Sequence, residues 1–124
     1  MTEAQEFILQ NFKEPNNFGE PNWIPSASST QLNPTCGDEV TVYLKIEQNI
    51  IKEIYFTGDG CSISIATASI LTQEFQNKAL EFVANYTEAS LLDLVGIPLT
   101  TSRKNCALLS LNAIKIALKL KEHN

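Results

Sequence analysis

Three cysteines and one aspartate are the residues of this sequence whose types and spacing could do chemistry. Cys36 precedes Asp38 by two positions, Cys61 follows a Gly-Asp-Gly run, and Cys106 follows Arg103 by three positions. Thiolate sulfur, with an occasional carboxylate oxygen, is the donor set that holds zinc and iron–sulfur clusters. The four side chains would together complete one tetrahedral metal site. Because a carboxylate is a more exchangeable donor than a thiolate, this set suits a metal that must be released.

Each of these residues also has a purely structural interpretation. Free cysteine is among the most buried residue types, so three core cysteines are the alternative to a metal site. Asp38 could be an ordinary turn or capping residue ahead of a strand. An odd number of cysteines nevertheless favours a metal or a reactive thiol over a disulfide framework. The only histidine, His123, stands next to the C-terminus, where we expect a tail residue rather than a ligand.

Length and charge restrict the function classes. A chain of 124 residues is expected to form one domain, residues 1–124. Its formal net charge of −5 argues against nucleic acid as a partner, because that role needs a basic patch. The acidic N-terminus does not resemble a signal peptide, and no stretch approaches the roughly 20 apolar residues of a membrane span. We therefore expect a cytoplasmic protein with no membrane partner.

The first half of the chain has the pattern of a short helix and a small sheet. Apolar residues at near-helical spacing predict a helix over residues 4–13. Residues 40–46 and 50–56 alternate and are rich in β-branched side chains, which predicts a hairpin. The preceding segment is rich in Pro, Ser, Thr and Asn, with one short edge strand expected at 27–32.

The second half of the chain changes to the helical period. Ser64 is expected to cap a long helix, and shorter helices are expected at 79–86 and 90–94. A last amphipathic helix is expected to begin at residue 101 or 102. Early strands and late helices predict an α+β fold, in which about three antiparallel strands are covered by helices.

None of the cysteines is expected in the middle of a helix or strand. Cys36 lies in a turn before the first hairpin strand, where Gly37 allows backbone angles that aim Cys36 and Asp38 at one point. Cys61 lies where the second hairpin strand passes into a helix, and Cys106 lies within the first two turns of the last helix. A helix N-terminus favours the anionic thiolate, which is the form that binds metal and accepts sulfur.

These motifs resemble those of the U-type iron–sulfur cluster assembly proteins, which include IscU, SufU and the N-terminal domain of NifU. The resemblance rests on the sequences of residues 8–19, 33–38 (Asn-Pro-Thr-Cys-Gly-Asp), 58–64 (Gly-Asp-Gly-Cys-Ser-Ile-Ser) and 103–106 (Arg-Lys-Asn-Cys). It implies an α+β fold with the three cysteines gathered into a metal site at one end. It also implies that the protein accepts sulfur beside a PLP-dependent cysteine desulfurase.

Details of the motifs indicate which branch of this family the sequence resembles. Asn105 stands where IscU-type scaffolds usually carry histidine, and the Cys-Ser-Ile-Ser run with Arg103 is closer to SufU, in which zinc occupies the site. However, the 44 residues between Cys61 and Cys106 leave little space for the insertion usual in SufU, which points toward the scaffold type. Residues 99–103 also depart from the Leu-Pro-Pro-Val-Lys motif by which the scaffold type is bound by its Hsp70 chaperone.

The leading hypothesis is a zinc-bound sulfur shuttle in iron–sulfur cluster biogenesis, at most a sulfurtransferase. Zn²⁺ is held by Cys36, Asp38, Cys61 and Cys106, and a cysteine desulfurase passes persulfide sulfur to Cys36. Cys106 is the alternative acceptor, and Arg103 could stabilise anionic sulfur. The sulfur is then delivered to cluster assembly or to apo iron–sulfur proteins. One alternative is a scaffold whose same ligands hold a transient [2Fe–2S] cluster, and another is a non-catalytic, zinc-stabilised interaction module.

Overall fold

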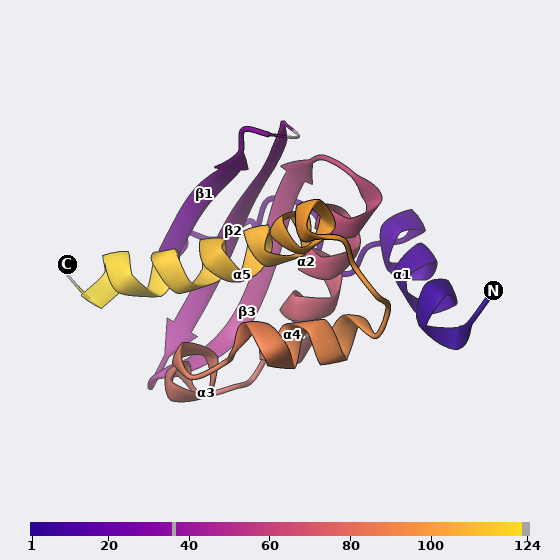
Figure 1. Ribbon diagram of the computed structural model, residues 1–124. Coiled ribbons are helices and arrows are strands. Elements are labelled where there is room, and N and C mark those ends of the chain that lie inside the picture. The colour runs from indigo at the N-terminus through magenta and orange to yellow at the C-terminus, as the bar shows by residue number, and fades with distance from the viewer. Residues whose placement is uncertain (36, 123–124) are drawn as a thin grey trace.

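The computed structural model describes residues 1–35 and 37–122, so Cys36 and His123 lie outside the described residues. The described elements are, in order, α1 (Glu3–Lys13), β1 (Ala27–Asn33), β2 (Asp38–Glu47), β3 (Ile50–Asp59), α2 (Ser62–Phe75), α3 (Leu80–Ala84), α4 (Glu88–Val95) and α5 (Thr101–Glu122). The strands form an antiparallel sheet in the order β1-β2-β3 and the helices pack against it (Figure 1). The predicted α+β class is confirmed.

The predicted hairpin is confirmed, and both of its strands are longer than expected. The pairing of β2 with β3 ends at Glu47 and Ile50, which leaves Gln48 and Asn49 as a two-residue turn. Both turn residues have positive φ angles, 55° and 62°, as a type I′ turn requires. This turn matches the right-handed twist of the two strands and sets their register next to the turn. The register shifts by one residue at an irregularity between Lys45 and Ile46, and the new register continues to the pair Glu39 and Asp59.

The register of β2 explains why Asp38 points inward. Val40, Val42 and Leu44 are fully buried, and they lie on the face of the sheet that meets the helices. Successive side chains of a strand alternate between its faces, so Asp38 shares the face of Val40. Because β2 begins at Asp38, two residues earlier than predicted, this carboxylate is the first inward side chain of the strand.

The helices form layers on one face of the sheet. Helix α5 packs across β1 and β2, α2 packs against β3 and α5, and α1 packs on α2 (Figure 1). Every residue from 63 to 72 of α2 is buried, which makes α2 the central helix of the molecule. Its small residues, among them Ala66 and Ala68, allow this close approach on several sides.

Two predictions about the helices are wrong in detail, and α1 has an unexpected buried residue. Helix α2 begins at Ser62 with Cys61 as its N-cap, so Ser64 is a residue of the first turn and not the cap. Helix α3 is shorter than the predicted 79–86. In α1 the side chain that is buried beside Ile8 is Asn11, whereas the apolar Phe12 is 40% exposed. Asn11 turns inward because its amide is hydrogen-bonded to side chains of α2.

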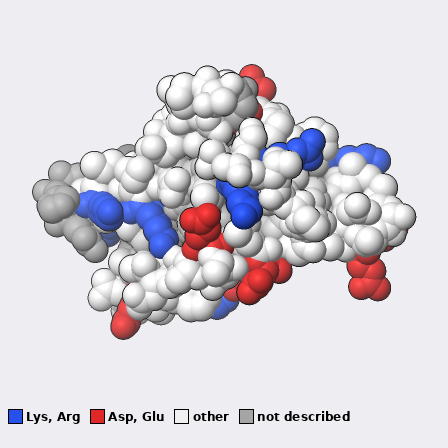
Figure 2. Space-filling view, viewed as in Figure 1, with Lys and Arg blue, Asp and Glu red and all other residues white. Residues whose placement is uncertain are grey.

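Charged side chains of both signs are scattered among uncharged ones on the face that carries α4 and α5 (Figure 2). Among the described residues, this face therefore carries no continuous cationic strip of the kind that follows a phosphate backbone. None of the described helices is both long enough and apolar enough to cross a membrane.

Candidate metal centre

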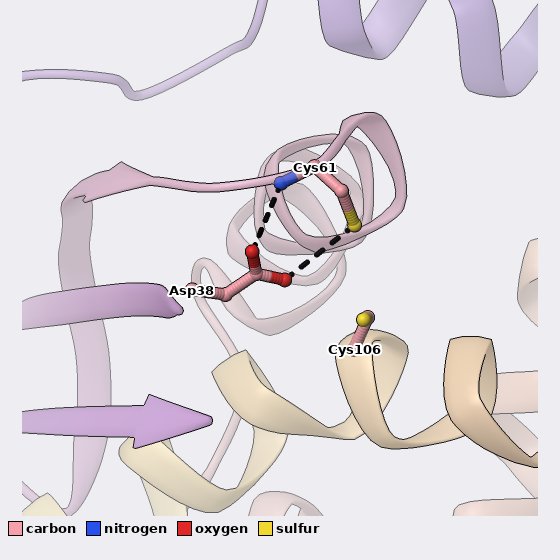
Figure 3. Close-up of side chains that lie close together, drawn as sticks. All are labelled: Asp38, Cys61 and Cys106. Atoms are coloured by element: carbon pink, nitrogen blue, oxygen red, sulfur yellow. Dashed lines mark hydrogen bonds between the residues drawn. The ribbon is translucent and has the colours of Figure 1, made fainter. Parts of the chain in front are cut away.

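Three elements that are distant in sequence bring one side chain each to a single point. Asp38 begins β2, Cys61 is the N-cap of α2, and Cys106 lies in the second turn of α5. Their ligand atoms all lie within 4.8 Å of one another, and the side chains converge in Figure 3. The structure thus brings together three of the four predicted ligands. The fourth, Cys36, lies outside the described residues.

The Asp38 carboxylate lies against the first turn of α2. Its Oδ1 accepts a hydrogen bond from the backbone N–H of Cys61 at 3.1 Å. Its Oδ2 accepts hydrogen bonds from the Ser64 hydroxyl and from the Cys61 thiol, the latter at 3.5 Å. Asp38 is 2% exposed, and the positive end of the helix dipole stabilises a carboxylate at this position. Asp38 is therefore more than a turn residue ahead of the strand.

The glycine that precedes Cys61 makes room for this carboxylate. A Cβ atom on Gly60 would lie 2.7 Å from both Cγ and Oδ1 of Asp38, closer than real Cβ contacts allow. A Cβ atom on Gly58 would likewise lie 2.7 Å from the backbone oxygen of Glu39. The Gly-Asp-Gly run therefore lets the end of β3 pass close to the start of β2. Gly37 has a φ angle of +74°, which agrees with the special backbone angles predicted for it.

The two described cysteines differ in accessibility. Cys61 is exposed, whereas Cys106 is 5% exposed. The alternative that all three cysteines are core residues is therefore wrong for Cys61. A partner can approach Cys61 directly, but it reaches the Cys106 sulfur only if neighbouring groups move.

The donor set fits a zinc ion. Tetrahedral zinc with Zn–S near 2.3 Å and Zn–O near 2.1 Å separates a sulfur from an oxygen ligand by about 3.6 Å and two sulfurs by about 3.8 Å. The Asp38 Oδ2 to Cys61 Sγ distance is 3.5 Å, and the full group lies within 4.8 Å. Asp38, Cys61 and Cys106 are thus close to the spacing that one metal ion requires, without rearrangement of the fold.

Sequence reasoning assigned Ser64 to the wrong role. Its side chain is 1% exposed and lies within the ligand cluster, 3.6 Å from Cys61 Sγ and 3.4 Å from the backbone oxygen of Cys106. The signal that could have placed it there is its spacing, because a residue three positions after Cys61 lies on the same helical face.

Arg103 lies near the start of α5 and lines a groove next to the residues that follow Cys61. It is exposed in the first turn of α5, one turn before Cys106. Arg103 lines an open groove of about 530 Å³, together with Gln5 and Ile8 of α1 and Ser62 and Ile63 of α2. The groove therefore runs from Arg103 to the residues that directly follow Cys61.

Comparison with known proteins identifies the family. The sequence pattern of the family described as NifU-like N terminal domain matches residues 3–123. This chain belongs to that family. The resemblance to U-type iron–sulfur cluster assembly proteins is confirmed.

Two curated relatives represent the two branches of the NifU-like family. The zinc-dependent sulfurtransferase SufU of Bacillus subtilis (strain 168) is 38% identical over 77 residues, which are 62% of this chain and 51% of that protein. The cluster assembly scaffold protein IscU 1 of Archaeoglobus fulgidus is 31% identical over 113 residues, which are 90% of this chain and 71% of that protein. The match thus spans about half the length of SufU and more of IscU 1. The 38% identity supports the predicted SufU branch.

Solved structures share the same fold. The N-terminal part of a NifU-like protein from Brucella abortus superposes with a TM-score of 0.80 at 19% identity, over 96% of this chain and 94% of that one. FiSufU, from the SUF system of Fervidobacterium islandicum AW-1, superposes with a TM-score of 0.72 at 25% identity, over 91% and 94% of the two chains. The order and packing of the elements in this chain are therefore those of the NifU-like fold.

Proposed function

We propose that this protein is a zinc-binding sulfur acceptor in iron–sulfur cluster biogenesis, which takes persulfide sulfur from a PLP-dependent cysteine desulfurase. The observation that carries the proposal is the convergence of Asp38, Cys61 and Cys106 within 4.8 Å in a chain of the NifU-like family. The 38% identity to a zinc-dependent sulfurtransferase favours zinc as the metal and sulfur transfer as the activity.

Cys36, Asp38, Cys61 and Cys106 would hold the metal. Bound Zn²⁺ would keep the thiols in the thiolate form and protect them from oxidation. Asp38 would provide the single oxygen donor. Its two oxygens are already held by groups of α2, so its position does not depend on the metal.

Sulfur transfer would occur at a cysteine that leaves the ligand set. The thiolate attacks the outer sulfur of the desulfurase persulfide, a new sulfur–sulfur bond forms, and the desulfurase cysteine departs as a thiolate. Cys36 is the proposed acceptor, since it precedes Gly37 in the sequence and glycine can adopt backbone angles that other residues rarely reach. Cys106 is the alternative acceptor, although its burial requires a larger movement. Arg103, exposed next to the cluster, would stabilise the anionic sulfur during transfer.

The groove between Arg103 and α1 is the proposed place of approach for the desulfurase. Its apolar lining includes Ile8 and Ile63, and it ends next to the exposed Cys61. A partner segment seated there would come within reach of the ligand cluster. The recipients would be later components of cluster assembly or apo iron–sulfur proteins in the cytoplasm.

The test is a desulfurase assay with the enzyme from the same organism. Alanine formation from cysteine should rise when the zinc-loaded protein is added, and mass spectrometry should find one added sulfur atom on the peptide that contains Cys36. The Cys36→Ser variant is the matched control, and it should neither stimulate the desulfurase nor carry the sulfur. Sulfur found only on Cys106 would overturn the acceptor assignment. Tight zinc without stimulation would instead support the non-catalytic zinc module.

A cluster scaffold is the second proposed function. It is favoured by the similarity to IscU 1 of Archaeoglobus fulgidus, which extends over 90% of this chain. The same thiolates and carboxylate would then hold a transient [2Fe–2S] cluster as cargo. Anaerobic reconstitution with iron and sulfide distinguishes the functions, because a scaffold should gain a visible chromophore and transfer it to an apo-ferredoxin. A protein that retains zinc and stays colourless would exclude the scaffold.

A further inference from the structure

We infer that Ser64 is a positioning residue for the metal site: its hydroxyl holds the Asp38 carboxylate in the orientation that presents one oxygen to the metal. This inference rests on the metal site of the proposed function. It does not depend on whether zinc or a cluster is the working cargo.

Ser64 contacts all three elements that build the site. It is the third residue of α2, and its hydroxyl donates a hydrogen bond to Oδ2 of Asp38 on β2. The same oxygen atom of Ser64 lies 3.6 Å from Cys61 Sγ and 3.4 Å from the backbone oxygen of Cys106 on α5. Burial to 1% exposure keeps water from replacing these contacts easily.

Two donors restrain the two oxygens of the carboxylate separately. The Cys61 N–H holds Oδ1 and the Ser64 hydroxyl holds Oδ2, so rotation about the Cβ–Cγ bond would break both hydrogen bonds. A hydrogen bond from a hydroxyl to a charged carboxylate is also stronger than one between neutral groups. Without the Ser64 hydroxyl, Oδ2 would lose its strongest described donor and keep the weaker thiol contact from Cys61 at 3.5 Å, so the carboxylate would be held less firmly.

The restrained orientation is the one that a metal needs. An oxygen of a carboxylate has two lone pairs, so Oδ2 can accept from Ser64 and still bind a metal. This oxygen lies 3.5 Å from Cys61 Sγ. A sulfur and an oxygen ligand of one tetrahedral zinc ion are expected to be about 3.6 Å apart. Ser64 therefore prepares Asp38 to bind through a single oxygen, and it restrains the most exchangeable ligand of the set.

The experiment measures zinc affinity of the full chain by competition with a chromophoric chelator. Outer partners of metal ligands typically contribute about 10–100-fold to metal affinity. Ser64→Ala should therefore bind zinc at least about tenfold more weakly. The visible spectrum of the Co²⁺-loaded protein should also change, because it reports ligand geometry and a merely structural serine would not alter it.

Three sets of variants separate positioning from a general loss of stability. Ser69→Ala removes another buried hydroxyl of α2, which bonds to Asn11 away from the ligands, and it should leave zinc affinity unchanged. Ser64→Thr and Ser64→Val have nearly equal volume, and only the threonine variant should retain affinity. In an Asp38→Ala background, Ser64→Ala should have no further effect, since Ser64 acts through that carboxylate.

Three results would overturn the inference. The first is zinc affinity and a Co²⁺ spectrum of Ser64→Ala equal to those of the unmutated protein. The second is an equal loss of affinity in Ser69→Ala. The third is a protein that binds no metal at all, which would also remove the metal site from the proposed function. A protein that binds zinc but fails to stimulate a desulfurase would contradict the sulfur-acceptor function and leave the role of Ser64 intact.

Discussion

Helix α2 carries two buried polar clusters that use the same residue type for different purposes. The first cluster, at the start of the helix, contains Asp38, Cys61 and Ser64 and reaches Cys106. The second cluster, about one and a half turns further on, surrounds Ser69. A serine hydroxyl of α2 is nearly inaccessible to solvent in both.

The second cluster is neutral, and its donors match its acceptors. Ser69 donates to the side-chain oxygen of Asn11 at 2.7 Å, and the Asn11 amide donates to the backbone oxygen of Phe7 at 2.9 Å. Gln73 also donates to Asn11, and the backbone N–H of Asn16 donates to Ser69 at 2.8 Å. Paired in this way, the cluster anchors α1 to α2 and offers a metal no anionic ligand.

The first cluster instead gathers a carboxylate and two thiols around one point. Each of these groups is a metal ligand in its anionic form, and a cation placed between them would offset their mutual repulsion. The comparison teaches that a buried serine on α2 does not by itself indicate function. The side chain that the serine contacts determines its role. Ser69 contacts an amide and helps to hold two helices together, whereas Ser64 contacts a carboxylate that lies beside two thiols, and these three groups can bind one metal ion.

Among the predicted changes, loss of a thiol should cause the largest decrease in zinc affinity. Cys61→Ser and Cys106→Ser each replace a soft sulfur donor, so zinc affinity should fall by more than the about 100-fold upper range of outer-partner substitutions. Metal analysis after gel filtration should then find well below one zinc per chain. Asn11→Ala is the control from the neutral cluster, and it should retain the full amount. Stoichiometric zinc in both cysteine variants would show that the cluster is not the metal site.

Asp38→Asn should cause the next largest decrease in zinc affinity. The amide retains an oxygen that can accept from the Cys61 N–H, but it lacks the negative charge that binds zinc. We expect an affinity loss of about 10–100-fold, comparable to losses of strong partners of metal ligands. Competition titration with a chelator measures it. Unchanged affinity would mean that Asp38 is only a bridge between β2 and α2.

Gly60→Ala should weaken the site through sterics alone. The added methyl group would lie 2.7 Å from the Asp38 carboxylate, so that carboxylate must shift away from its present position. Zinc should then bind about tenfold more weakly, as expected when a ligand loses its orientation. The rise in melting temperature on addition of zinc should become smaller than in the unmutated protein. An equal rise would show that the carboxylate position tolerates displacement.

Asn11→Ala should have the smallest effect on zinc and a clear effect on stability. It leaves the buried Ser69 hydroxyl without its amide acceptor, which should lower the free energy of unfolding by about 1–3 kcal/mol. Chemical denaturation of the metal-free protein measures this loss. Zinc affinity should stay within error, and a large decrease would show that the two clusters are coupled through α2.

Local patterns along the chain were sufficient for most of the elements and for the three donors that the structure brings together. Alternation predicted the hairpin, the helical period predicted α2 and α5, and the cysteines with Asp38 predicted the kind of metal site. The inward orientation of Asp38 could also have been read from the sequence, because it has the same parity as Val40, Val42 and Leu44. The family followed from the motifs around the cysteines.

The long-range partners of Ser64 and Asn11 were decided by the tertiary structure. The sequence pattern predicted Ser64 as a helix cap, which is wrong, and it gave no signal that Asn11 is buried. Their partners, Asp38 and Ser69, lie 26 and 58 residues away in the chain. Sequence periodicity determines which elements form and which faces are apolar, because it acts over a few residues. Which polar groups meet in the interior depends on how β2, α1 and α5 pack against α2, and only the folded chain brings those groups together.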